Sequence, residues 1–112
     1  MASLVGYEAE QRAKSYLLEN SLRFVEQNYK AKVGEIDLIM LDENQLVFVE
    51  VKFRSTASRG SAAEQFTPSK RKRLERTINY YLLQKKLNPH HTNLRIDVVA
   101  IDGEQVNWIQ NV

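Results

Sequence analysis

The sequence of 112 residues contains no cysteine, so the chain can form neither disulfides nor thiolate metal sites. That composition fits the reducing cytoplasm. No apolar run approaches membrane-spanning length, and residues 1–14 lack the basic-then-apolar layout of a secretion signal. The net charge of +2 is too small to indicate a nucleic-acid partner by itself. We therefore expect one globular cytoplasmic domain over residues 1–112, without membrane association.

The apolar periodicity divides the chain into two helices and five strands. It predicts helices over residues 3–20, with Ser3 as N-cap, and over residues 67–87, with Thr67 as N-cap and Pro68 at the first helical position. Strands are expected at residues 22–29, in a hairpin over 34–54 that turns at 42–45, and at 94–101 and 105–110. Residues 55–61 suggest a mobile loop. This order predicts a mixed α/β domain with helices against a central sheet.

Charged side chains interrupt the two apolar strands of the hairpin. Because side chains alternate along a strand, Glu35 and Asp37 share one face of the first strand. Glu50, Lys52 and Arg54 likewise share one face of the second strand. Burying such charges is costly unless they are paired or bind a metal. The hairpin is therefore the candidate functional element.

A divalent metal site explains this pattern. Asp37 and Glu50 on adjacent strands can converge on one cation, and the backbone carbonyl of Val51 can add an oxygen ligand. Such an ion activates water and polarises a phosphodiester. Lys52 would orient or deprotonate the attacking water, or stabilise the developing charge. The pattern favours a metal-dependent nuclease.

A structural ladder of salt bridges is the competing interpretation. In that ladder Glu35 or Glu50 would pair with Lys52 or Arg54 across an exposed antiparallel face. The same two faces also carry apolar side chains that argue against full exposure, namely Ile39, Leu41, Leu46 and Phe48. We therefore favour the metal site.

Both predicted helices carry charged residues of interest. The first half of the second helix is basic, and a solvated face and phosphate contact both remain open explanations for it. On the first helix, Glu10 shares a face with Ala13 and Leu17. From periodicity alone, a solvent-exposed carboxylate in the first turns is the favoured interpretation of Glu10.

The segments GEIDLI (34–39) and FVEVKFR (48–54) resemble the YraN-type family of bacterial proteins. That family is similar to archaeal Holliday junction resolvases and to the PD-(D/E)xK nuclease superfamily. The resemblance covers most of the chain and extends to further positions: Gly6, Glu10, Ala13, Tyr16, Leu17, Asn28, Lys70 and residues 95–97. Two positions depart from the pattern, because Ile36 replaces the proline before the aspartate and Ala9 replaces a common glycine.

The resemblance implies a restriction-endonuclease-like αβββαβ core, with a mixed central sheet flanked by helices. It implies Asp37 and Glu50 as metal ligands and Lys52 as the catalytic lysine. It also places Glu10 in the acidic cluster, and leaves Glu35 either to bind the metal through water or to pair with a base.

The sequence therefore predicts a DNA endonuclease that uses Mg²⁺ or Mn²⁺, with branched, Holliday junction-like DNA among its substrates. Basic side chains would contact phosphates without reading bases: Arg54, Arg59, Lys70, Arg71, Arg73 and Arg76. Cleaving both strands of a junction requires two sites, which a homodimer would provide. The alternatives are a non-catalytic nucleic-acid-binding module that kept the fold, and an interaction protein that uses the second helix. Intact Asp37, Glu50 and Lys52 weigh against the binding module, and salt-insensitive partner binding without DNA affinity would favour the interaction protein.

Overall fold

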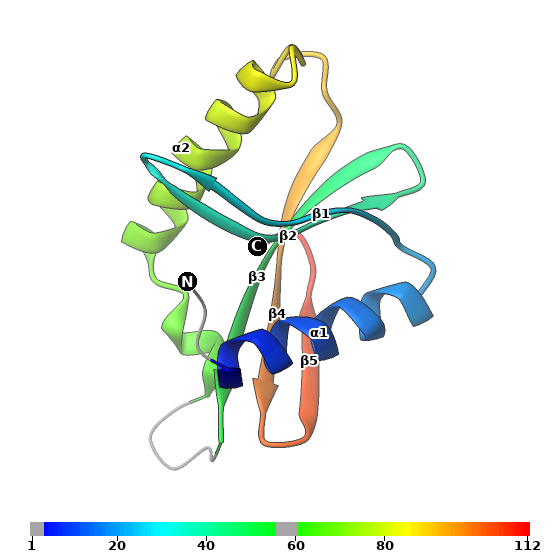
Figure 1. Ribbon diagram of the computed structural model, residues 1–112, viewed down its shortest axis with the longest axis vertical. Coiled ribbons are helices and arrows are strands. Elements are labelled where there is room, and N and C mark those ends of the chain that lie inside the picture. Colours follow the sequence, from blue (N-terminus) through cyan, green and yellow to red (C-terminus); the bar gives the residue numbers. More distant parts are fainter. Residues whose placement is uncertain (1–3, 56–60) are drawn as a thin grey trace.

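The computed structural model describes residues 4–55 and 61–112, which form a five-stranded sheet between two helices (Figure 1). The elements are α1 Leu4–Glu19, β1 Arg23–Ala31, β2 Gly34–Asp42, β3 Gln45–Arg54, the 3₁₀ helix η1 Ala62–Gln65, α2 Pro68–Gln84, β4 Leu94–Asp102 and β5 Gln105–Ile109. The strands lie in sequence order, and only β3 and β4 are parallel. The connection from β3 to β4 passes through η1 and α2. The predicted mixed α/β domain with an αβββαβ core is confirmed, with β5 added at the edge.

Alternate residues of β3 divide the core into two parts. Val47 and Val49 belong to the cluster beneath α1, which also contains Leu17. Phe48 lies in the cluster beneath α2, where its ring centroid is 5.6 Å from that of Tyr81. α2 turns a buried apolar stripe toward the sheet: Leu74, Ile78, Tyr81 and Leu82. Each helix therefore covers one face of the same sheet.

The predicted start of α2 is confirmed, and its predicted end at residue 87 is wrong. The side chain of Thr67 accepts a hydrogen bond from the Lys70 N–H at 3.4 Å. The helix ends at Gln84 because Lys86 adopts a left-handed φ of 59°. The Leu87 N–H then donates to the Leu82 carbonyl at 2.8 Å, which closes the helix end.

Other boundaries differ from the prediction by a few residues. β1 continues to Ala31, so the turn before β2 contains only residues 32–33. β5 ends at Ile109, and η1 was not predicted. The N-cap assigned to Ser3 and most of the loop predicted at 55–61 lie outside the described residues. No helix in the described part of the chain is long and apolar enough to cross a membrane.

Candidate functional site

The candidate site lies where β2 and β3 separate. Their paired residues run from Asp42–Gln45 to Leu38–Val49, whereas β3 and β4 remain paired as far as Arg54 and Asp102. Beyond Val49, the edge of β3 that faced β2 is therefore open. We refer to this place as the strand fork.

A side chain of β2 takes the place of the missing strand partner at the fork. The Val51 N–H donates a hydrogen bond to Oδ2 of Asp37 at 2.8 Å. The N–H and C=O groups of one strand residue point toward the same edge of the strand. The Val51 carbonyl is thus directed to the side on which the Asp37 carboxyl group lies.

A cleft of about 550 Å³ opens at the strand fork. Its lining contains predicted site residues from four elements: Glu10 of α1, Glu35 and Asp37 of β2, Glu50, Val51 and Lys52 of β3, and Lys70 and Arg73 of α2. The structure therefore brings the predicted acids and the predicted lysine to one place. Residues of η1 and α2 reach the same cleft because the crossover connection returns them to the end of β3.

Asp37 and Glu50 form the closest acidic pair in the cleft. Burial raises the pKa of Asp37 to about 8, and the hydrogen bond and negative charge of Glu50 add to this effect. The N–H of Val51 and the positive charge of Lys52 act in the opposite direction. At neutral pH the Asp37 carboxyl group is therefore protonated beside Glu50.

Glu10 is buried, with only 6% of its surface exposed. The solvent-exposed position favoured by periodicity alone is wrong, and the family resemblance is what indicated its inward position. Burial and the negative charge of Asp37 raise the pKa of Glu10, while the side chains of Asn28 and Gln27 partly offset the rise. Oε1 of Glu10 is buried and makes no hydrogen bond.

The donor set of the cleft fits a hard divalent cation, because it consists of carboxylate and carbonyl oxygens. Within residues 4–55 and 61–112, no three His, Cys, Asp or Glu side chains lie close enough together to hold a metal ion. A Mg²⁺ site here would thus use Asp37, Glu50 and the Val51 carbonyl. Mg²⁺ commonly binds one or two carboxylates and completes its octahedron with water and substrate phosphate. Glu10 and Glu35 would act at longer range.

The salt-bridge ladder that competed with the metal site is not formed. In the described part of the chain, no ion pair joins Glu35 or Glu50 to Lys52 or Arg54. Lys52 instead lines the cleft beside the acids and acts on the Asp37 pair through its charge. Among the described residues, the charged side chains of the hairpin thus form no ion pair with one another, and Asp37 and Glu50 are joined by a hydrogen bond.

The basic residues predicted to contact phosphates do not all reach the cleft. Lys70 and Arg73 line it, whereas Arg71 points elsewhere and donates a hydrogen bond to the carbonyl of Val112. Arg71 also pairs with Glu75 at 3.8 Å. The guanidinium group of Arg71 is therefore bound to Val112, although the sequence alone predicted that it would contact DNA phosphates.

Three further residues were predicted to contact phosphates. Two of them do not line the cleft, and the third lies outside the described residues. Arg76 is an exposed residue of α2 that does not line the cleft. Arg54 ends β3, and its buried Nε has no hydrogen-bond partner. Arg59 lies outside the described residues. Lys70 and Arg73 are therefore the predicted phosphate contacts that the structure puts beside the acids.

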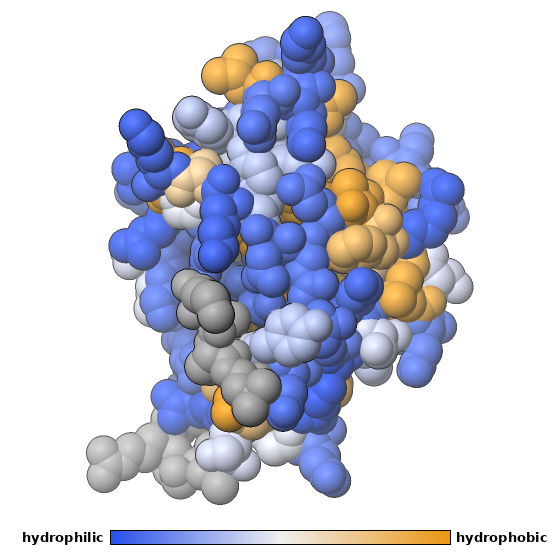
Figure 2. All heavy atoms as spheres, viewed as in Figure 1, coloured by the Kyte–Doolittle hydropathy of each residue, from blue (hydrophilic) through white to orange (hydrophobic). Residues whose placement is uncertain are grey.

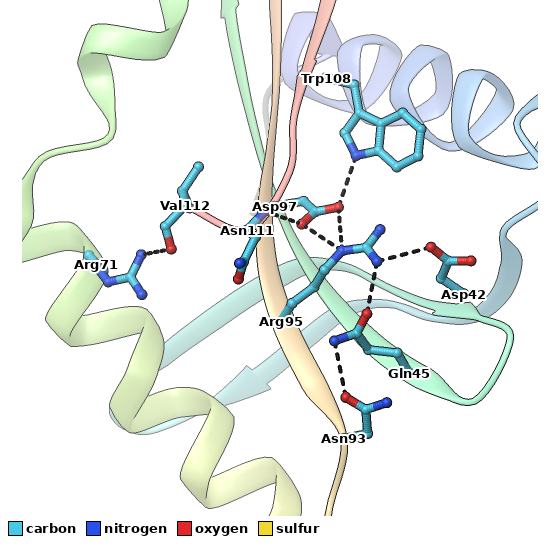
Figure 3. Close-up of polar contacts among 9 residues, drawn as sticks. All are labelled: Asp42, Gln45, Arg71, Asn93, Arg95, Asp97, Trp108, Asn111 and Val112. Carbon is cyan, nitrogen blue, oxygen red and sulfur yellow. Dashed lines mark hydrogen bonds and ion pairs between the residues drawn. The ribbon is translucent and has the colours of Figure 1, made fainter.

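A second polar cluster, which was not predicted, stabilises β4 (Figure 3). Asp97 is fully buried and accepts hydrogen bonds from Arg95 Nε at 3.0 Å, Trp108 Nε1 at 2.9 Å and the Asn111 N–H at 2.9 Å. Arg95 also binds Asp42 at 2.9 Å. Because its carboxylate is paired with a guanidinium and two further donors, we interpret this cluster as structural. The packed position predicted for Trp108 is confirmed.

The fold and the cleft define a class of protein: a mixed α/β domain in which acids and a lysine meet at a fork in the sheet. The model of the uncharacterised protein family UPF0102 matches residues 9–101. This chain belongs to that family, the YraN family that its sequence resembles. The matched range contains the acids of the cleft and Lys52.

The chain is similar to UPF0102 proteins of several marine bacteria. It is 46% identical over 104 residues to the protein of Aliivibrio fischeri strain MJ11, covering 91% of this chain and 85% of the relative. It is 47% identical over 109 residues to that of Vibrio campbellii, with 96% and 89% covered. For Colwellia psychrerythraea the identity is 43% over 110 residues, with 95% and 85% covered.

Proposed function

We propose that this protein is a Mg²⁺-dependent endonuclease that hydrolyses phosphodiester bonds in DNA, with Mn²⁺ as an alternative cofactor. The observation that carries the proposal is the contact between Asp37 and Glu50 at the strand fork, with Lys52 in the same cleft. Two half-buried acids in contact, one of them protonated at neutral pH, destabilise a fold unless another role retains them. A divalent cation in place of that proton provides such a role.

In this proposal the acids of the cleft hold the ion and Lys52 acts on the reacting groups. A bound cation would lower the pKa of a water molecule and polarise the scissile phosphate. Asp37, Glu50 and the Val51 carbonyl would hold the ion. Lys52 would orient the attacking water or stabilise charge on the leaving oxygen. Glu10 would act at longer range through its charge, which already acts on Asp37.

The substrate is DNA held by its backbone, because the basic residues of the cleft are suited to phosphates rather than to base edges. Lys70 and Arg73 of α2 would provide these contacts. Branched, Holliday junction-like DNA is part of the proposed substrate range. A homodimer would present the two clefts that cutting both strands of a junction requires.

The test is cleavage of four-way junction, flap, single-stranded and linear DNA by the purified protein with Mg²⁺ or Mn²⁺. We expect metal-dependent cleavage that falls by at least about a hundredfold in Glu50→Gln, which keeps the shape of a ligand and removes its charge. Glu104→Gln, in the exposed turn between β4 and β5, is the matched control and should cleave normally. Absence of metal-dependent cleavage by the parent protein, or its survival in Glu50→Gln, would overturn the proposal.

A non-catalytic DNA-binding module is the second candidate function. It is favoured by the lack of a third acidic side chain near enough to Asp37 and Glu50, among the described residues, to share their ion. Under this alternative, the parent protein and Glu50→Gln would bind DNA equally well, and neither would cleave it with Mg²⁺.

A further inference from the structure

We propose that the turn between β1 and β2 forms a second phosphate-binding subsite, in which Lys30 and Lys32 act together with Arg73. This subsite would bind the backbone of duplex DNA a few nucleotides from the scissile phosphate. The inference rests on the proposed nuclease function for the identity of the ligand. Its geometry, however, stands apart from the acids, because Lys30 and Lys32 have no task in the proposed hydrolysis.

A second hollow of about 440 Å³ lies beside the cleft and is lined by residues 30–35 together with Arg73. It shares three lining residues with the cleft: Gly34, Glu35 and Arg73. The two hollows therefore form one continuous surface from the acids to the β1–β2 turn. Figure 1 shows this turn extending across α2.

Close packing holds the turn against α2. A Cβ atom at Gly34 would lie 2.7 Å from Oγ1 of Thr77 and 3.4 Å from Cγ of Arg73, and the φ of Gly34 is +155°. Thr77 is fully buried, and its hydroxyl donates to the Arg73 carbonyl at 2.9 Å. Glycine thus permits an approach that any side chain would prevent. The lysines of the turn and Arg73 are consequently held on one rim before any ligand binds.

Acidic and basic side chains gather at different parts of this surface, with Glu35 between them. The floor of the cleft carries Asp37 and Glu50 beside Lys52, whereas exposed cations lie around it: Lys30, Lys32, Lys70 and Arg73. The exposed Glu35 lines both hollows and is the register partner of Lys30. None of the ion pairs in residues 4–55 and 61–112 uses a cation of this rim. The surface over the turn and α2 is mostly hydrophilic (Figure 2). An acidic floor with an unpaired basic rim suits a polyanion that meets the floor only through a bound cation.

The spacing of the two hollows matches a nucleic-acid backbone. Lys30 pairs with Glu35 across the hairpin, two positions before Asp37. At roughly 3.3 Å per strand residue, these two positions span about 7 Å along β2. One strand of duplex DNA advances about 3.4 Å per nucleotide along the helix axis. With the duplex axis along β2, the subsite would contact phosphates about two nucleotides from the cut.

Among the described residues, the basic side chains lie on one side of the cleft. Its α1 wall is formed by the uncharged residues Val5, Gly6 and Ala9 together with Glu10. Within residues 4–55 and 61–112 that wall has no cation for a phosphate, so the duplex would be anchored on the α2 side.

The test measures binding of a fluorescent 20-base-pair duplex by anisotropy, in EDTA to prevent cleavage, over a series of salt concentrations. The double variant Lys30→Gln/Lys32→Gln is compared with Arg23→Gln/Lys86→Gln, which removes the same charge from exposed positions at other places. Because each phosphate contact contributes about 0.9 to the slope of log K against log salt, the first variant should lose about 1.8 of that slope. We also expect its Kd to rise by about tenfold at moderate salt, while the control stays within about twofold of the parent.

The outcomes separate this inference from the proposed nuclease function. If Lys30→Gln/Lys32→Gln and the control give the same Kd and slope, or if the parent does not bind duplex DNA, the subsite is wrong. That conclusion holds even when the parent cleaves DNA with Mg²⁺. If binding depends on the two lysines but no cleavage is found, the subsite stands and the nuclease proposal fails.

Discussion

The raised pKa of Asp37 makes the stability of the protein depend on pH in an unusual direction. Asp37 stays protonated in the folded protein up to about pH 8, because burial and Glu50 raise its pKa. In the unfolded chain an aspartate ionises near pH 4. The folded state therefore binds the extra proton between these values, so this contribution to stability is greatest at the acidic end of the range and falls as the pH rises. Asp37→Asn removes this titration and should make the decline shallower, leaving the smaller contribution of Glu10.

The size of the effect follows from proton linkage. One proton bound only by the folded state changes the free energy of unfolding by about 1.36 kcal/mol per pH unit. Between pH 5 and pH 7 the parent should lose about 2.7 kcal/mol relative to Asp37→Asn. For a chain of this length that corresponds to a relative fall in Tm of about 10 °C. The asparagine keeps an acceptor for the Val51 N–H, so its own effect on packing should be small.

The assay is thermal unfolding followed by circular dichroism in EDTA, at half-unit steps from pH 5 to pH 8. Glu43→Gln serves as the control, because this exposed carboxylate at the β2–β3 turn lies far from the fork. It should keep the pH dependence of the parent. If Asp37→Asn and the parent lose stability in parallel over this range, Asp37 does not hold a proton at neutral pH and the electrostatic account of the site is wrong.

Three further predictions concern the cation, the polar cluster and the helix acid. Mg²⁺ should raise the Tm of the parent at pH 8 but not that of Asp37→Asn or Glu50→Gln, since binding to the folded state alone stabilises it; equal shifts in all three proteins would argue against this ion site. Arg95→Met should lower the free energy of unfolding by about 3–5 kcal/mol in urea, because Asp97 loses its buried cation, and a loss below about 1 kcal/mol would contradict that assignment. Glu10→Gln should gain stability relative to the parent as the pH rises from 4 to 8, because burial and Asp37 raise the pKa of Glu10 and only the parent loses a proton. Tm values of both proteins at the two pH values test this, and a relative loss of stability in Glu10→Gln at pH 8 would contradict it.

The order of the elements was accessible from the sequence because it depends on local periodicity. Strand alternation in the hairpin separated Val47 and Val49 from Phe48 correctly, and these side chains do lie in different cores. The end of α2 was not accessible in the same way. A lysine, Lys86, adopts the left-handed conformation there, whereas the usual signals for a helix end are glycine and asparagine.

The side-chain environment of the site depended on tertiary contacts that periodicity does not describe. Glu10 is buried because α1 docks through Ala9 and Ala13, and small residues allow that close approach. Arg71 was expected to contact phosphates, but it donates a hydrogen bond to the carbonyl of Val112, which lies far from it in the sequence. A family resemblance supplied the position of Glu10, and no signal in the sequence supplied that of Arg71.

The strand fork connects the stability of the sheet to the composition of the cleft. Where β3 loses β2 as a partner, the Val51 N–H would be left without an acceptor, and Asp37 provides one at 2.8 Å. Asp37→Ala would therefore remove a cleft acid and orphan a backbone donor at once, at a cost of about 1–3 kcal/mol in stability. Asp37→Asn keeps an acceptor oxygen and removes only the charge. Loss of activity in the alanine variant would thus mix unfolding with chemistry, whereas loss in a fully folded Asp37→Asn protein reports on the carboxylate alone. If urea denaturation in EDTA finds Asp37→Ala and Asp37→Asn equally stable, the hydrogen bond from the Val51 N–H does not stabilise the fork.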